Sequence, residues 1–337
     1  MNKKTKVAIN GFGRIGKLAF RSIFANPQFE IVGINDLSNL ETIAYLLKYD
    51  TAQGSYKTDS VSYENNYLVV DGKKIPVFQE RNPKDLPWGK LDADVVLECT
   101  GFFASKEKAD LHLQAGAKKV LISAPATGDL KTVVYNVNDN VLTKDDHIVS
   151  GASCTTNCLA PIAKVLNDNF GINQAFMTTV HSYTGDQTLI DQNHSKGIWA
   201  RRGRAAASNM VPTSTGVVKA IGLVLPELKG KIDGTSVRVP TVTGSLVDLT
   251  VELNQEVTAE QVNQVFAKNA NETLGYVKDP IVSSDIVGTS YGSLYDSNTL
   301  QILHKKPKFI KLMSWYDNEM SYVSQLVRLL HKMSTLL

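Results

Sequence analysis

The chain has 337 residues, of which 43% are hydrophobic and 20% are charged, and its formal net charge at pH 7 is +3. The length favours two domains of roughly 150 residues each, and the small charge gives no reason to expect a nucleic-acid partner. Apolar runs stay well short of the ~18 residues that a membrane span needs. The basic N-terminus is followed by Asn10 and Gly11 instead of the apolar core of a signal peptide. We therefore expect a cytoplasmic protein that requires neither nucleic acid nor a membrane.

The first 150 residues alternate short apolar runs with amphipathic stretches, which is the pattern of a parallel sheet covered by helices. The apolar runs lack polar alternation, as expected of strands that are buried on both faces. Predicted strands are 6–10, 30–36, 94–99, 119–123 and 147–150, and predicted helices are 15–25 and 106–115.

A G-x-G-x-x-G pattern occupies residues 11–16, between the first predicted strand and the first predicted helix. Its glycines suit a tight turn, close approach of a pyrophosphate and close helix–strand packing, and the start of the helix attracts phosphate. The pattern alone is weak evidence, since a glycine-rich turn also fits it. Asp36, which ends the second predicted strand, strengthens the assignment of the pattern to a dinucleotide site. Its carboxylate can accept hydrogen bonds from ribose hydroxyls and would repel the 2′-phosphate of NADP. The sequence therefore predicts a Rossmann domain that binds NAD.

The second half has a different character. Residues 174–183 and 245–253 alternate like strands with one buried face, and 309–315 is a further strand candidate. Thr258 and Gln261 form a capping box that opens a helix toward residue 270, and 318–333 is a terminal helix. A long polar loop, 185–205, lies between them. We expect an α+β domain with a mainly antiparallel sheet.

Three cysteines, Cys99, Cys154 and Cys158, form neither a disulfide framework nor a zinc pattern, so no metal site is predicted. Cys99 is interpreted as a small core residue, and Cys158 as a packing residue one helical turn after Cys154. Cys154 falls at the predicted start of a helix, where the dipole favours a thiolate. A buried structural thiol is the alternative, but its polar neighbours argue against it.

A base is expected near this thiol. His181 ends an alternating strand and can complete a thiolate–imidazolium pair. Taken by itself, the residue fits equally well as a hydrogen-bonded polar residue at a strand end that has no catalytic role. The five other histidines, His112 among them, lack comparable context. A reactive thiolate beside a dinucleotide indicates one chemistry: the thiolate adds to an aldehyde, hydride leaves to nicotinamide, and a thioester remains.

Four motifs carry a resemblance that extends from residue 6 to about 330. The sequence resembles the phosphorylating, NAD-dependent glyceraldehyde-3-phosphate dehydrogenase family, of the bacterial type. The motifs occur in the order and spacing of that family, and together they are highly specific. They are NGFGRIG at 10–16, ASCTTNCLAP at 152–161, DGTSVRVPT at 233–241 and WYDNEMSY at 315–322.

The resemblance implies an NAD-binding Rossmann domain over 1–153, a catalytic domain over 154–317, and a terminal helix over 318–337 that packs back on the first domain. It implies the glycolytic oxidation of D-glyceraldehyde 3-phosphate with NAD and inorganic phosphate to 1,3-bisphosphoglycerate, through a cysteine thiohemiacetal and a thioester. A homotetramer is expected as well.

The resemblance also assigns roles to residues. Cys154 is the nucleophile, and His181 is the base. Substrate and inorganic phosphate are held by Ser153, Cys154, Thr155, Thr184, Arg202, Thr215, Gly216 and Arg238. The cofactor is held by Gly11, Gly13, Arg14, Ile15, Gly16, Asp36, Arg81, Thr100, Ser123, Asn318 and Tyr322.

The sequence departs from the family pattern at two places, and three alternative functions stay open. Residues 191–194 lack the leucine–proline pair common in NAD-specific members, and the loop around 197–199 is a few residues longer than usual. Because that loop reaches a neighbouring subunit's cofactor in the family, the change can alter NAD affinity. The rivals are erythrose-4-phosphate dehydrogenase, a non-phosphorylating relative, and a non-catalytic NAD-binding or adhesin role.

Overall fold

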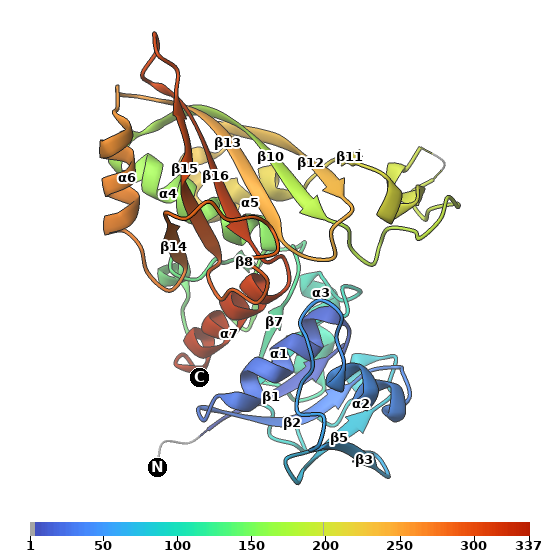
Figure 1. Cartoon of the computed structure of the whole chain (residues 1–337). Coiled ribbons are helices and arrows are strands. Elements are labelled where there is room, and N and C mark those ends of the chain that lie inside the picture. Colours follow the sequence, from blue (N-terminus) through green and yellow to red (C-terminus); the bar gives the residue numbers. More distant parts are fainter. Residues whose placement is uncertain (1–3, 198) are drawn as a thin grey trace. The chain divides into compact units, whose positions relative to one another are not determined.

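The computed structural model of the chain describes residues 4–197 and 199–337. The chain forms two compact units, and the main boundary between them falls after Ser153. The first unit contains the residues up to Tyr135, Asp139–Ser153 and Val323–Leu337, and the second contains Asn136–Asn138 and Cys154–Tyr322. Each unit is built around one sheet (Figure 1). Among the described residues, no helix has both the length and the apolarity that crossing a membrane requires.

The sheet of the first unit is mainly parallel. In spatial order its strands are β3 (Val61–Glu64), β4 (Tyr67–Val70), β5 (Lys73–Phe78), β2 (Phe29–Asn35), β1 (Thr5–Asn10), β6 (Val95–Glu98), β7 (Lys119–Ile122), β9 (Ile148–Ser150) and β8 (Lys131–Thr132). Only β3–β4 and β4–β5 pair antiparallel. The five strands predicted in this half correspond to β1, β2, β6, β7 and β9, each within one residue at either end.

Helices cover both faces of this sheet, which explains its continuous apolar strands. Ile9 of β1 packs in one buried cluster, while its neighbour Ala8 packs in another with Trp88. Ala109 belongs to a third cluster with residues of β7 and β9. The α-helices of the unit are α1 (Arg14–Ala25), α2 (Leu40–Lys48) and α3 (Lys106–Gln114), together with the part of the terminal helix from Val323 onward.

The sheet of the second unit is mixed, with four antiparallel and two parallel strand pairs. In spatial order its strands are β11 (Val211–Thr213), β12 (Ile232–Val239), β10 (Ile172–Ser182), β13 (Ser245–Leu253), β16 (Phe309–Tyr316), β15 (Ser293–Ile302) and β14 (Leu274–Val277). Alternate residues of β13 are buried, so its predicted one-sided pattern is confirmed, and β16 has the same pattern. The mainly antiparallel sheet is confirmed too.

A layer of helices covers one face of the second sheet (Figure 1). The layer consists of α4 (Cys154–Phe170), α5 (Val217–Val224) and α6 (Ala259–Lys268). The predicted capping box of Thr258 and Gln261 opens α6. The terminal helix α7 (Met320–Ser334) begins two residues later than predicted, after Asp317 accepts the backbone N–H of Glu319. From Val323 onward the chain belongs to the first unit.

Candidate active site

The glycine pattern follows β1 and opens α1. Gly11 has a φ of +91°, which a side chain rarely tolerates, and a Cβ there would lie 2.8 Å from the backbone nitrogen of Thr100. A Cβ on Gly16 would lie 2.0 Å from the carbonyl oxygen of Gly11. A Cβ on Gly13, the N-cap of α1, would meet nothing within 4 Å. The first and third glycines therefore permit packing, and the second leaves space where a pyrophosphate can approach the helix N-terminus.

Asp36 lies directly after β2 and is tied to the glycine loop. Its Oδ2 accepts the backbone N–H of Phe12 at 2.6 Å, and its Oδ1 accepts that of Ser38 at 2.9 Å. These bonds fix the carboxylate at the carboxyl end of the parallel sheet, where such sheets bind ligands. The side chain of Arg14 instead forms a bidentate pair with buried Asp50. Its expected contact with a pyrophosphate is thus left to the backbone, as it is for Ile15 beside it.

The other expected cofactor residues of this unit follow strand ends. Exposed Arg81 comes after β5, and the neighbouring Glu80 donates its N–H to Asn35 at the end of β2. Half-buried Ser123 follows β7 and donates its N–H to the carbonyl oxygen of Glu98 at 2.9 Å. Arg81 and Ser123 therefore lie, like Asp36, at the carboxyl end of the parallel strands.

Glu98, at the end of β6, holds Thr100. Its carboxylate accepts the N–H of Thr100 at 2.7 Å and the hydroxyl of the same residue, the amide of Asn10, and Nε2–H of His112 at 3.0 Å. All these partners except Thr100 are fully buried. No local sequence pattern marks this role of His112, because its carboxylate and indole partners lie 14 and 24 positions away in sequence.

Cys99 lies between these residues and is half-buried rather than a core residue. Burial raises the pKa of its thiol to about 12. Cys158, in contrast, is completely buried, and burial raises its pKa to about 12 as well. The predicted packing role of Cys158 is confirmed, and Cys154 remains as the candidate nucleophile.

Cys154 is the first residue of α4, and its Sγ lies 3.4 Å from Nε2 of His181 at the end of β10. The Nδ1 atom of His181 lies 2.7 Å from the carbonyl oxygen of Ser182. A carbonyl only accepts, so Nδ1 carries the proton and Nε2 presents a lone pair to the thiol. The backbone thus selects the tautomer in which His181 can remove the proton of Cys154.

Burial sets the resting charge of this pair. It lowers the pKa of His181 to about 3, and the charge of Arg238 adds to this effect. Burial also raises the pKa of Cys154, although Arg238 and hydrogen bonding to Thr155 oppose the rise. Both shifts favour the neutral forms, in which the thiol of Cys154 donates to Nε2 of His181, and the thiolate–imidazolium pair stays a prediction.

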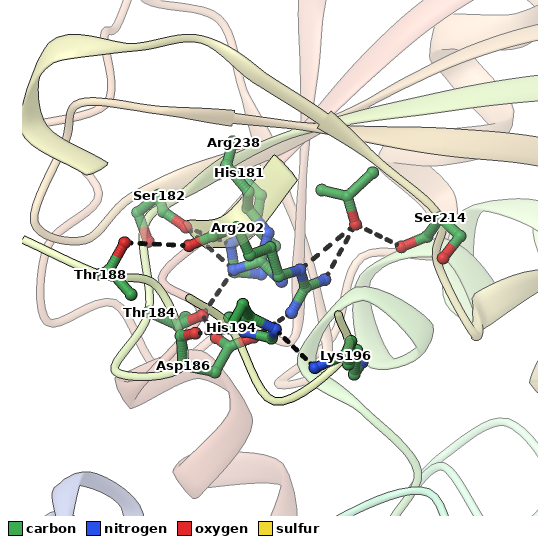
Figure 2. A network of polar contacts seen from close by, with 11 residues as sticks. His181, Ser182, Thr184, Asp186, Thr188, His194, Lys196, Arg202, Ser214 and Arg238 are labelled. Carbon is green, nitrogen blue, oxygen red and sulfur yellow. Dashed lines mark hydrogen bonds and ion pairs between the residues drawn. The ribbon is translucent and has the colours of Figure 1, made fainter. Parts of the chain in front are cut away.

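Arg238 is the register partner of His181 on the adjacent parallel strand β12. Its Nη1 donates to the carbonyl oxygen of Ser182 at 3.2 Å and to the hydroxyl of Thr184 at 2.7 Å (Figure 2). Its Nε is buried and, within the described part of the chain, has no hydrogen-bond partner. A guanidinium with an unused buried donor beside a reactive thiol suits the oxygen of a bound anion.

Arg202 lies in a 3₁₀ turn, Arg201–Gly203, of the long loop. Its Nε and Nη2 atoms lie 3.3 and 3.1 Å from the hydroxyl of Thr213, and its Nη1 pairs with Asp186. Asp186 in turn accepts the hydroxyl of Thr184 (Figure 2). The structure thus joins three expected phosphate residues, Thr184, Arg202 and Arg238, through a carboxylate that the sequence did not single out. Ile198 of the altered loop lies outside the described residues.

The remaining phosphate residues are placed differently. The Thr155 hydroxyl is buried 3.0 Å from the hydroxyl of Tyr316. Thr215 and exposed Gly216 precede α5, and the Thr215 hydroxyl accepts the N–H of Val217 at 3.3 Å. Ser153 is the last residue of the first unit before Cys154.

Asn318, which follows β16 in sequence, is buried. Its Oδ1 accepts the hydroxyls of Ser182 at 2.8 Å and Ser245 at 3.0 Å and the N–H of Gly244 at 3.1 Å. These donors fix the orientation of the amide. Tyr322, in the first turns of α7, is buried.

Comparison with known proteins decides the family. Residues 5–106 match the glyceraldehyde 3-phosphate dehydrogenase NAD binding domain, and residues 153–318 match the C-terminal domain. Over 97% of its length the chain is 55% identical to glyceraldehyde-3-phosphate dehydrogenase of Clostridium pasteurianum. Over 96% it is 53% identical to the Clostridium acetobutylicum protein and 51% to that of Streptococcus pyogenes, and each alignment covers 97% of the relative. The chain belongs to the glyceraldehyde-3-phosphate dehydrogenase family.

Membership confirms the predicted fold class, a Rossmann unit followed by an α+β unit, and the predicted cofactor, NAD. As a member of the glyceraldehyde-3-phosphate dehydrogenase family, the chain is an NAD-dependent oxidoreductase. The residues fit that cofactor: the glycine turn leaves space at Gly13, and the Asp36 carboxylate is fixed beside the glycine loop, directly after β2. Thr100 and Ser123 each donate a backbone N–H to Glu98, at the carboxyl end of the same parallel strands.

Proposed function

We propose that this dehydrogenase oxidises D-glyceraldehyde 3-phosphate with NAD and inorganic phosphate, giving 1,3-bisphosphoglycerate and NADH in glycolysis. The supporting observation is the 3.4 Å contact of the Cys154 thiol with the unprotonated Nε2 of His181, next to the unused buried donor of Arg238. The names of the relatives point to the same substrate.

His181 and Cys154 carry the covalent chemistry of this proposal. Nε2 of His181 takes the thiol proton as Sγ bonds to the aldehyde carbon, and the carbonyl oxygen receives that proton, giving a thiohemiacetal. Bound NAD supplies the hydride acceptor. When the C–H bond is broken, Nε2 removes the hydroxyl proton, and the C=O bond of a thioester forms on Cys154.

Inorganic phosphate then attacks the thioester carbon, and the C–S bond breaks to leave the thiolate, which recovers its proton from His181. Thr184, Arg202 and Arg238 are proposed to hold phosphate oxygens, because forked guanidiniums and a hydroxyl match that geometry. Ser153, Thr155, Thr215 and Gly216 are proposed as further phosphate contacts, and Arg14, Ile15, Arg81, Asn318 and Tyr322 as cofactor contacts.

The test is NADH formation from D-glyceraldehyde 3-phosphate and NAD, with and without inorganic phosphate. We expect sustained turnover only with phosphate, and none in Cys154→Ser. Equal turnover without phosphate would mean that water resolves the thioester and that the anion assignment is wrong. Faster turnover of erythrose 4-phosphate would transfer the proposal to that substrate.

Family resemblance also supports a homotetramer and a cytoplasmic location as proposals. Sedimentation of the purified protein tests the first: a particle near four times the chain mass of 36.9 kDa is expected, and a monomer would contradict it. Fractionation of the source cells tests the second.

A further inference from the structure

Asp186 places a negative charge among the proposed phosphate-binding groups. One of its oxygens pairs with Nη1 of Arg202, and the other accepts the hydroxyl of Thr184. That hydroxyl oxygen accepts Nη1 of Arg238 at 2.7 Å. Figure 2 shows the resulting chain, in which one carboxylate connects two guanidiniums through a hydroxyl. The side chain therefore uses the same kinds of donor that a phosphate would use.

The carboxylate is charged at neutral pH. Burial raises the pKa of Asp186, but hydrogen bonds from Thr184 and Arg202 and the charge of Arg202 outweigh burial and hold the pKa below its ordinary value. Asp186 thus balances part of the positive charge of Arg202 and Arg238.

Asp186 and Arg202 differ in how easily each can move. The side chain of Asp186 is 44% exposed, whereas that of Arg202 is 18% exposed and remains hydrogen-bonded to Thr213. The backbone around Asp186 is held separately, since its carbonyl oxygen lies 3.0 Å from Nε2 of His194. Rotation of the Asp186 side chain into water can therefore release Arg202 and Thr184 without moving the loop.

We propose that Asp186 is an internal anion that competes with phosphate for Arg202 and Thr184. A phosphate group then binds only as the carboxylate gives up these contacts, and the carboxylate reclaims them when the phosphate leaves. Asp186 is a positioning residue in this account, and it sets phosphate affinity below the value that the arginines alone would give. The inference rests on the proposed assignment of Arg202 and Thr184 to phosphate.

Asp186 could instead assist phosphate binding, which is the role opposite to competition. If the carboxylate serves mainly to aim the guanidinium of Arg202, its removal weakens phosphate binding instead of strengthening it. The two accounts therefore predict changes of opposite sign. The same loop offers a matched control, because Arg204 pairs with Asp191 in an exposed ion pair that contains no proposed phosphate residue.

The experiment compares Asp186→Asn, which keeps the side-chain shape and removes the charge, with Asp191→Asn. The KM for inorganic phosphate is measured at fixed ionic strength with saturating NAD and D-glyceraldehyde 3-phosphate. Asp186→Asn is expected to lower this KM by about twofold to fivefold, the range for a partly exposed ion pair. Asp191→Asn is expected to leave it unchanged.

A binding readout that needs no turnover accompanies the kinetics: the shift in melting temperature produced by inorganic phosphate alone. A larger shift in Asp186→Asn than in Asp191→Asn supports the proposal. An unchanged or higher KM, or an equal or smaller shift, overturns it. If Arg202→Gln alters neither KM nor shift, the phosphate assignment itself fails; if Arg202→Gln weakens binding and Asp186→Asn does not strengthen it, only the competition is wrong.

Discussion

The indole Nε1–H of Trp88 donates to Nδ1 of His112 at 3.0 Å, and this bond selects the tautomer of a fully buried imidazole. Nε2 of His112 therefore carries the proton and donates to Glu98. The arrangement parallels that of His181, whose tautomer is fixed by a backbone carbonyl. In the first unit the selected proton stabilises a buried carboxylate, whereas in the second the selected lone pair faces a nucleophile.

Removal of the His112 side chain should destabilise the first unit. His112→Leu takes one donor from a buried carboxylate and is expected to lower the free energy of unfolding by about 3 kcal/mol. Trp88→Phe removes the upstream N–H and should also be destabilising. In the double variant the second change should cost less than it does alone, because the bond that it breaks is already lost. Urea denaturation of the four proteins checks this, and additive losses would show that the two residues are not coupled.

Replacement of His181 should impair both thiol reactivity and catalysis. His181→Asn removes the lone pair 3.4 Å from Sγ of Cys154, and kcat/KM is expected to fall by about 100- to 10,000-fold. The rate of Cys154 alkylation by iodoacetamide at pH 7 should fall as well, because burial alone then holds the proton on the thiol. Mass spectrometry confirms the labelled residue. An alkylation rate equal to that of the unmodified protein would assign the proton acceptor to another group.

Asp146 should make stability depend on pH in the acid range. Its Oδ2 accepts Nζ of Lys131 at 2.8 Å and the N–H of Thr143 at 2.7 Å. Burial raises the pKa of Asp146, but these partners outweigh burial and hold the pKa below its ordinary value. A lowered folded-state pKa stabilises the fold above the unfolded pKa, about 3.9, and this contribution is lost as pH falls through the folded value.

Asp146→Asn is therefore expected to cost about 1–2 kcal/mol of unfolding free energy at pH 7. The difference from the unmodified protein should shrink as the pH drops below about 4. Denaturation curves across this range measure it, with exposed Asp145→Asn as the control. A difference that does not vary with pH would mean that the charge of Asp146 is not what stabilises the fold.

The parts of the fold that could be predicted from sequence are those with a strong local pattern. Strand β13 was expected at its observed bounds because alternate residues face the core. The parallel strands β1, β2, β6, β7 and β9 were predicted because their apolar runs lack polar alternation, as in strands that are covered on both faces. Strands β3 and β4 were missed, since most residues of β3 are exposed and the pairing of the two depends on a turn. Helix α2 was missed because its exposed surface carries Tyr45 and Leu46, which obscure the amphipathic pattern.

The candidate site residues that stand out in the sequence are those at the end of a predicted strand or the start of a predicted helix. Cys154, His181 and Asp36 are of this kind. The direction of the pKa shift of Cys154 was not predictable, because the burial that raises this pKa depends on packing from distant segments. Asp186 was missed for a related reason. Its carboxylate pairs with Arg202, which lies 16 positions away across an irregular loop, so no local pattern marks the pair.

Gly13 and Gly16 provide the sharpest test of the dinucleotide assignment, because the same substitution should act differently at each. In Gly16→Ala the added Cβ would lie 2.0 Å from the backbone oxygen of Gly11, so the strand–helix packing must shift. We expect a loss of about 2–3 kcal/mol in unfolding free energy.

In Gly13→Ala the added carbon meets no protein atom within 4 Å, and stability should change by less than about 1 kcal/mol. NAD affinity should nevertheless fall about tenfold or more, because the methyl group fills the space that a pyrophosphate needs. Thermal unfolding without cofactor and calorimetric titration with NAD separate the two effects. Normal NAD affinity in a stable Gly13→Ala protein would place the pyrophosphate away from the start of α1.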